Sequence, residues 1–209
     1  MVAASQPNGT AGTAGTAGTA VTARTQSGNG ALLGALLAVA AGVMFVSALI
    51  GAYFSVRNWV GVGDGGFIPD ALKFDNYAGF MTMVSGLAAA FAAEWALVSA
   101  RLRKSRWATA GYGLSVLFMV GAINSVWHIG QRSRLAAGET AYAVLFYAVL
   151  SAMTLSLIVG IIAAVVNLVR VMAGHVWGDD LLVGRAGNWF IRFAALTATI
   201  GFFLIYTYK

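Results

Sequence analysis

The side chains that most often bind haem or metal ions are scarce in this sequence. Its 209 residues include no cysteine and only two histidines, His128 and His175. Without cysteine, the chain can form neither a disulfide nor a thiolate metal site. Haem iron and copper both commonly take imidazole ligands, and two histidines are too few for a haem pair plus a copper site. We therefore expect no cofactor and no metal ion in this chain by itself.

Glu94 is the carboxylate with the most suggestive position. It lies in an apolar run, about two helical turns before the basic segment RLRKSR at residues 101–106. A carboxylate there can pair with Arg101 or Arg103, or it can collect protons for a neighbouring subunit. The sequence leaves both roles open. Two adjacent aspartates, Asp179 and Asp180, are expected to be solvated surface charges.

The long uncharged run at residues 140–169 contains a pair of polar side chains of interest. This run is well beyond the ~20 residues that cross a ~30 Å hydrocarbon core, and a helix satisfies its own backbone hydrogen bonds there. Ser151 and Thr154 are three residues apart and therefore share one helix face. Their hydroxyls are candidates for an interface with a neighbouring helix or subunit. The alternative is a helix packed in a bundle without chemistry of its own.

The composition indicates the kind of protein in which these polar residues lie. The chain is 59% hydrophobic and 10% charged, whereas about a quarter of the residues of soluble domains are charged. Its net charge of +6 comes from basic residues at the ends of apolar runs, which favours a membrane and not a nucleic acid. The sequence predicts an all-α polytopic membrane protein with a five-transmembrane-helix bundle. Residues 30–209 form its one membrane domain, with spans at about 31–56, 77–100, 107–129, 140–169 and 189–208.

Residues 1–29 precede this domain as a low-complexity tail. Gly-Thr-Ala repeats four times between Gly9 and Ala20. Small and polar residues bury too little surface to offset chain entropy, so the tail is predicted to be disordered. It is a poor signal peptide because no lysine or arginine precedes Arg24.

The basic residues also predict an orientation. By the positive-inside rule, the dense basic segment at 101–106 is predicted to lie in the cytoplasm. The N-terminus is then on the same side of the membrane, and five spans put the C-terminus outside. In that topology His128 and His175 lie at opposite membrane faces and cannot share a metal ion. Arg192 follows Trp189 by one turn near the start of the fifth span, and we expect it to snorkel back to the near interface.

Aromatic and small residues in two spans resemble those of a known family. The pattern in the first span is Met44-Phe45, Tyr53-Phe54-Ser55 and Arg57, and that in the fourth is Tyr142, Phe146-Tyr147, Gly160 and Arg170. Their order and spacing are similar to those of subunit III of the haem-copper oxidases, the cytochrome c oxidase type. The polar run Gly121–Asn124 falls where that family has a polar patch. Over residues 31–208 the five-span layout resembles the short bacterial form of subunit III.

The chain departs from the family where subunit III carries its own polar side chains. The replaced positions are Gly42 and Val43 in the first span, Ser125 and Val126 in the third, Ser151, Met153 and Ser156 in the fourth, and Phe190 and Phe193 in the fifth. The resemblance therefore describes either a divergent subunit III or a paralogue with a changed role.

The resemblance implies a non-catalytic subunit of a terminal respiratory oxidase in a bacterial plasma membrane. Such a subunit stabilises subunit I, binds phospholipid between its helices and assists oxygen or proton delivery. Its partners are subunits I and II, which hold the haem and copper. Two alternatives stay open, namely the related accessory subunit of nitric oxide reductase and a small transporter or membrane anchor. Transporters commonly have broken helices and internal repeats, and this sequence shows no repeat.

Overall fold

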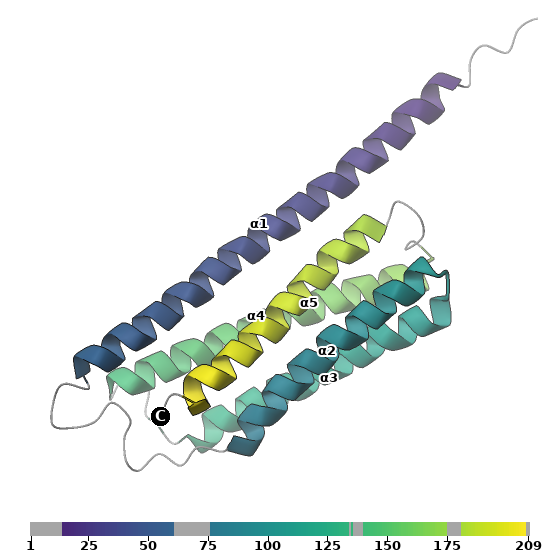
Figure 1. The fold of residues 1–209 in the computed structure, drawn as a ribbon. Coiled ribbons are helices and arrows are strands. Elements are labelled where there is room, and N and C mark those ends of the chain that lie inside the picture. Colours follow the sequence, from purple (N-terminus) through teal and green to yellow (C-terminus); the bar gives the residue numbers. More distant parts are fainter. Residues whose placement is uncertain (1–13, 61–75, 134, 136–139, 175–180, 208–209) are drawn as a thin grey trace, which may run out of the picture.

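The computed structural model describes residues 14–60, 76–133, 135, 140–174 and 181–207. Throughout these residues the regular structure is helical (Figure 1). The elements are α1 (Ala14–Val60), α2 (Asn76–Arg101), α3 (Ser105–Arg132), α4 (Ala141–Met172), α5 (Leu181–Phe202) and the short π-helix η2 (Phe203–Thr207) that continues α5. Five helices in this part of the chain are long and apolar enough to cross a membrane. The predicted all-α, five-span architecture is confirmed.

Four of the helices form a closed ring, and the fifth lies outside it. Helix α2 packs on α3, α3 on α4, α4 on α5, and α5 returns to α2. We call α2, α3, α4 and α5 the four-helix ring. Helix α1 packs mainly on α5 and only slightly on α4. In Figure 1, α1, α5 and α2 form the nearer layer, and α4 and α3 lie behind them.

The predicted ends of the second, third and fourth spans agree closely with the helices, but those of the first and fifth do not. Helix α5 begins at Leu181 instead of residue 189, because Gly184, Arg185 and Asn188 continue the helix despite their low hydropathy. Helix α1 begins at Ala14, inside the tail for which we expected disorder, and residues 1–13 lie outside the described residues. With 47 residues, α1 is about 70 Å long, more than twice a ~30 Å hydrocarbon core. Figure 1 shows its N-terminal part extending beyond the other helices.

Two local motifs fix the ends of the ring helices. Helix α2 ends in a Schellman turn, in which the N–H of Lys104 donates to the carbonyl of Ser99 and the N–H of Arg103 to that of Ala100. Arg103 takes the left-handed position of this turn, with a φ of 55°. At the start of α4, the hydroxyl of Thr140 accepts a hydrogen bond of 3.1 Å from the N–H of Ala143. The connection from α2 to α3 is therefore tight, and it brings the basic segment to one end of the ring.

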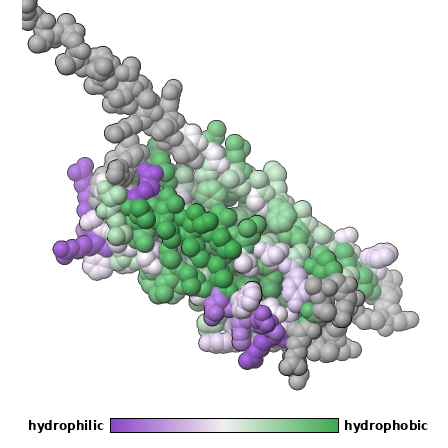
Figure 2. All heavy atoms as spheres, turned by 180° about the vertical axis from the view of Figure 1, so that it is seen from behind, coloured by the Kyte–Doolittle hydropathy of each residue, from purple (hydrophilic) through white to green (hydrophobic). Residues whose placement is uncertain are grey.

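The surface of the bundle is apolar over its middle. Figure 2, seen from behind relative to Figure 1, shows a broad hydrophobic region with hydrophilic residues on either side of it. Large apolar side chains near the middle of α3 and α4, such as Leu117, Val120, Leu155 and Ile162, are exposed. Such an arrangement suits a protein whose middle is surrounded by hydrocarbon and whose ends reach water.

Candidate functional site

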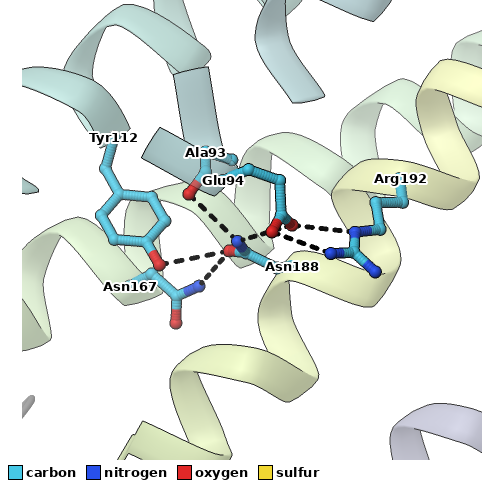
Figure 3. A network of polar contacts seen from close by, with 6 residues as sticks. All are labelled: Ala93, Glu94, Tyr112, Asn167, Asn188 and Arg192. Atoms are coloured by element: carbon cyan, nitrogen blue, oxygen red, sulfur yellow. Dashed lines mark hydrogen bonds and ion pairs between the residues drawn. The ribbon is translucent and has the colours of Figure 1, made fainter. Parts of the chain in front are cut away.

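Asn188 joins all four helices of the ring through one buried side chain. It lies on α5 and is 2% exposed. Its Oδ1 atom accepts hydrogen bonds from the hydroxyl of Tyr112 on α3, at 3.2 Å, and from Nδ2 of Asn167 on α4, at 3.4 Å. Its Nδ2 atom donates to α2, to the carbonyl of Ala93 at 3.0 Å and to Oε1 of Glu94 at 3.2 Å (Figure 3). Both ends of the amide are thus used between helices.

Glu94 and Arg192 form an ion pair at the outer end of this network. Nε of Arg192 donates to Oε1 of Glu94 at 2.8 Å, and Nη2 of Arg192 lies 2.8 Å from Oε2. The pair is therefore bidentate, which is the strong geometry for a guanidinium and a carboxylate. The guanidinium also lies 5.3 Å from the ring centroid of Trp189. Figure 3 shows the pair on the side of Asn188 away from Tyr112 and Asn167.

A glycine on α5 makes room for the inner end of the network. Nδ2 of Asn167 also donates to the carbonyl of Gly184 at 3.1 Å. A Cβ atom added at Gly187 would lie only 2.5 Å from that same nitrogen. Any larger residue at position 187 would therefore displace Asn167. Glycine at positions 184 and 187 allows α4 and α5 to approach closely enough to share a polar contact.

This network corrects two predictions about charged residues. Glu94 does form an ion pair, but with Arg192 of α5; Arg101 and Arg103 are exposed and form no ion pair with it in the described part of the chain. Arg103 instead occupies the Schellman turn. Arg192 does not snorkel back along its own helix, since its guanidinium is held across the gap to α2. It also lies well inside α5, because that helix begins at Leu181.

Ser151 and Thr154 open onto one groove on the opposite side of the ring. The groove has a volume of about 870 Å³ and lies mainly between α3 and α4, with Phe45 of α1 at its edge. Both hydroxyls bond within α4: that of Ser151 donates to the carbonyl of Ala148 at 2.8 Å, and that of Thr154 to that of Leu150 at 2.9 Å. Their shared face is as predicted. Their role at a subunit interface stays a prediction.

The remaining predicted positions do not gather into a site. His128 is an exposed residue of α3, and His175, Asp179 and Asp180 lie outside the described residues. Within the described ranges, no three histidine, aspartate or glutamate side chains come together as metal ligands would.

Sequence reasoning missed Asn188 and Tyr112 as parts of the network. Asn188 was placed just outside the fifth span, although Leu181, Leu182 and Val183 before it are apolar and could have indicated an earlier helix start. Tyr112 carries no signal of its own in an apolar span. The comparisons with known proteins add no relative: no protein-family model and no curated protein matches the chain.

Proposed function

We propose that this chain is a non-catalytic subunit III of a terminal respiratory haem-copper oxidase. It is embedded in a bacterial plasma membrane with its N-terminus in the cytoplasm and its C-terminus outside. It supports the fold of subunit I and packs phospholipid between its helices. Subunits I and II carry the haem and copper, and this chain has no active site of its own.

One observation carries the proposal: four of the residues that resemble subunit III, namely Tyr53, Tyr142, Phe146 and Gly160, are buried in the bundle, whereas Met44, Phe45 and Phe54 are exposed. Tyr53 of α1 and Tyr142 and Phe146 of α4 are buried. The rings of Tyr142 and Phe146 stack with centroids 6.0 Å apart. Gly160 faces Met119 of α3, which a Cβ atom would approach to 3.0 Å. The buried part of the resemblance therefore includes a contact between α4 and its neighbours in the ring, at Gly160.

Several of the positions that depart from the family also serve packing, although Val43 and Ser151 are exposed. Gly42 of α1 and Phe193 of α5 are two of these, and they contact one another. Met153 is buried against Gly201, and the Ser156 hydroxyl donates to the Met153 carbonyl at 2.8 Å. These contacts favour a subunit that contributes packing more than proton handling.

Purification through a tag on this chain tests the proposal. In mild detergent the chain should bring down an oxidase core with a haem absorption spectrum, and harsher detergent should leave the chain colourless. If no haem protein accompanies the chain under mild conditions, the respiratory assignment fails.

A phosphatase fused after Lys209 should be active, which checks the orientation separately. Oxygen reduction by the purified complex, compared with nitric oxide reduction, separates the oxidase from the related reductase.

The ion pair within the membrane-spanning region favours a second candidate, a small transporter. Charged residues inside spans often mark a path for a substrate or an ion. However, α2, α3 and α4 run without interruption through their spans, whereas transporter sites are typically built at broken helices. If no haem protein accompanies the chain in mild detergent, the transporter becomes the favoured function.

A further inference from the structure

The Glu94–Arg192 pair lies inside the membrane-spanning parts of its two helices. At 1.5 Å per residue, Glu94 is about 10 Å from the end of α2 at Arg101, and Arg192 is about 16 Å from the start of α5 at Leu181. Both helices belong to the spans that are apolar enough to cross a membrane. The pair therefore lies at a depth where hydrocarbon replaces water.

The pair is open to the outside of the bundle at this depth. The Arg192 side chain is 45% exposed and that of Glu94 34%. The residues one turn away on the same surface are large, apolar and exposed: Phe91 and Val98 on α2, and Leu196 on α5. We call this surface the α2–α5 face. Polar groups that meet hydrocarbon without a partner are costly, so a side chain pair so exposed requires polar cover.

The chemistry of the pair defines what can cover it. Both carboxylate oxygens of Glu94 already accept bonds from Arg192, and Oε1 also accepts from Asn188. Nη1 of Arg192 has no acceptor among the described residues, so the cover must offer an oxygen. It must also be uncharged, since the pair is neutral overall. A lipid phosphate would meet the repulsion of the carboxylate that is held 2.8 Å from the guanidinium.

We propose that the α2–α5 face is the docking surface for a transmembrane helix of the haem-bearing partner. That helix presents a neutral oxygen, from a serine, threonine, asparagine or glutamine side chain, to Nη1 of Arg192. The apolar residues around the pair pack against the rest of the helix. This inference rests on the proposed function and assigns its partner to one face. The ion pair is the polar anchor of the contact, and Asn188 fixes its orientation from inside the ring.

Single cysteines test the docking surface directly, because the natural chain contains none. Leu196→Cys and Phe91→Cys place a thiol beside the ion pair. Leu117→Cys is the control, because it places a thiol at an exposed position of α3, away from the α2–α5 face. Each variant is labelled with a photoreactive maleimide in native membranes, illuminated and purified through the tag. The haem-bearing partner should be crosslinked from positions 196 and 91 at least about tenfold more than from position 117, as expected for a specific and not a random contact.

A second pair of variants tests the anchor. Arg192→Lys keeps the charge but lacks the guanidinium fork, and Glu94→Gln combined with Arg192→Gln keeps the size of both side chains without charge. Recovery of the haem partner should fall about tenfold in both, the effect of losing one such contact. The yield and helicity of the chain itself provide the control for folding.

The outcomes separate this inference from the proposed function. If wild-type chain brings down the haem partner but crosslinks arise equally or preferentially from position 117, the docking face is wrong and the function stands. Crosslinks from position 196 to lipid alone, or to a second copy of this chain, also overturn the docking face. If wild-type chain brings down no haem protein at all, the function fails and this inference fails with it.

Discussion

The four-helix ring and helix α1 are held in place by different means. Within the ring, Asn188 bonds to residues of the three other helices. At the contact of helix α1 with α5, Gly42 lies against the aromatic ring of Phe193. In the most apolar stretch of each helix, 11% of the residues of α1 are buried, against 44% in α5. One buried amide thus connects the ring helices, whereas α1 buries a much smaller share of its surface.

The difference matters because hydrocarbon gives apolar helices little reason to associate. In lipid, helices are held together by close packing and interhelical hydrogen bonds, since lipid tails are as apolar as leucine. A buried amide that reaches three neighbours fixes which helices meet and at what depth. A glycine contact permits close approach but leaves the helix more easily displaced. We therefore expect the ring to be the stable unit and α1 its adjustable part.

Asn188→Leu should produce the largest loss of stability. It removes the interhelical bonds of Asn188 and leaves the Tyr112 hydroxyl and the Asn167 amide without this acceptor. Each such bond in a membrane contributes on the order of 0.6 to 1.7 kcal/mol, so we expect a loss of about 2 to 4 kcal/mol. Unfolding in mixed micelles measures it. Asn124→Leu changes the same residue type at an exposed position of α3 and should cost almost nothing.

Gly42→Leu should have a smaller effect that is confined to α1. A Cβ atom at position 42 would lie 2.6 Å from the Phe193 ring, and the rest of a leucine side chain reaches further, so the Phe193 ring must shift or α1 must move away from α5. Overpacking of this kind costs roughly 1 to 3 kcal/mol. A spin-label or crosslinking distance between α1 and α5 should increase, while distances within the ring stay unchanged.

Two further variants sharpen this result. Combining Gly42→Leu with Phe193→Ala should restore the distance between α1 and α5. Gly34→Leu, at a position with nothing within 4 Å, should leave it unaltered. If Gly42→Leu instead disrupts the ring, the ring and α1 are not independent.

Arg103→Gly should produce the smallest change, a gain. Arg103 has a φ of 55°, a conformation that costs an ordinary L-residue about 1 kcal/mol and glycine nothing. Arg106→Gly removes the same charge from the first turn of α3 and should instead destabilise by roughly 0.5 to 1 kcal/mol. Thermal unfolding of the two variants tests the turn, because the helix dipoles predict the opposite signs: loss of a cation destabilises at the C-terminal end of α2, near Arg103, and stabilises in the first turn of α3, at Arg106.

The sequence predicted the number of spans and most of their ends, because charged residues and tryptophans interrupt the apolar runs there. It failed at Leu181, where α5 begins, because glycine, arginine and asparagine belong to a helix whose start hydropathy alone places later, at residue 189. It also failed to find the partner of Glu94. Arg101 is nearer along the chain, but Arg192, 98 residues away, is nearer in space. That proximity depends on the depth and rotation of α2 against α5, which no local pattern encodes.

The central structural claim is that Glu94 and Arg192 tie α2 to α5 at the outer end of the Asn188 network. A double-mutant cycle with Glu94→Gln and Arg192→Gln, followed by unfolding in micelles, tests it most directly. We predict a coupling free energy of about 1 to 3 kcal/mol for this pair and one near zero for Glu94 with Arg101. Additive effects of Glu94→Gln and Arg192→Gln, or a larger coupling with Arg101, would contradict the claim.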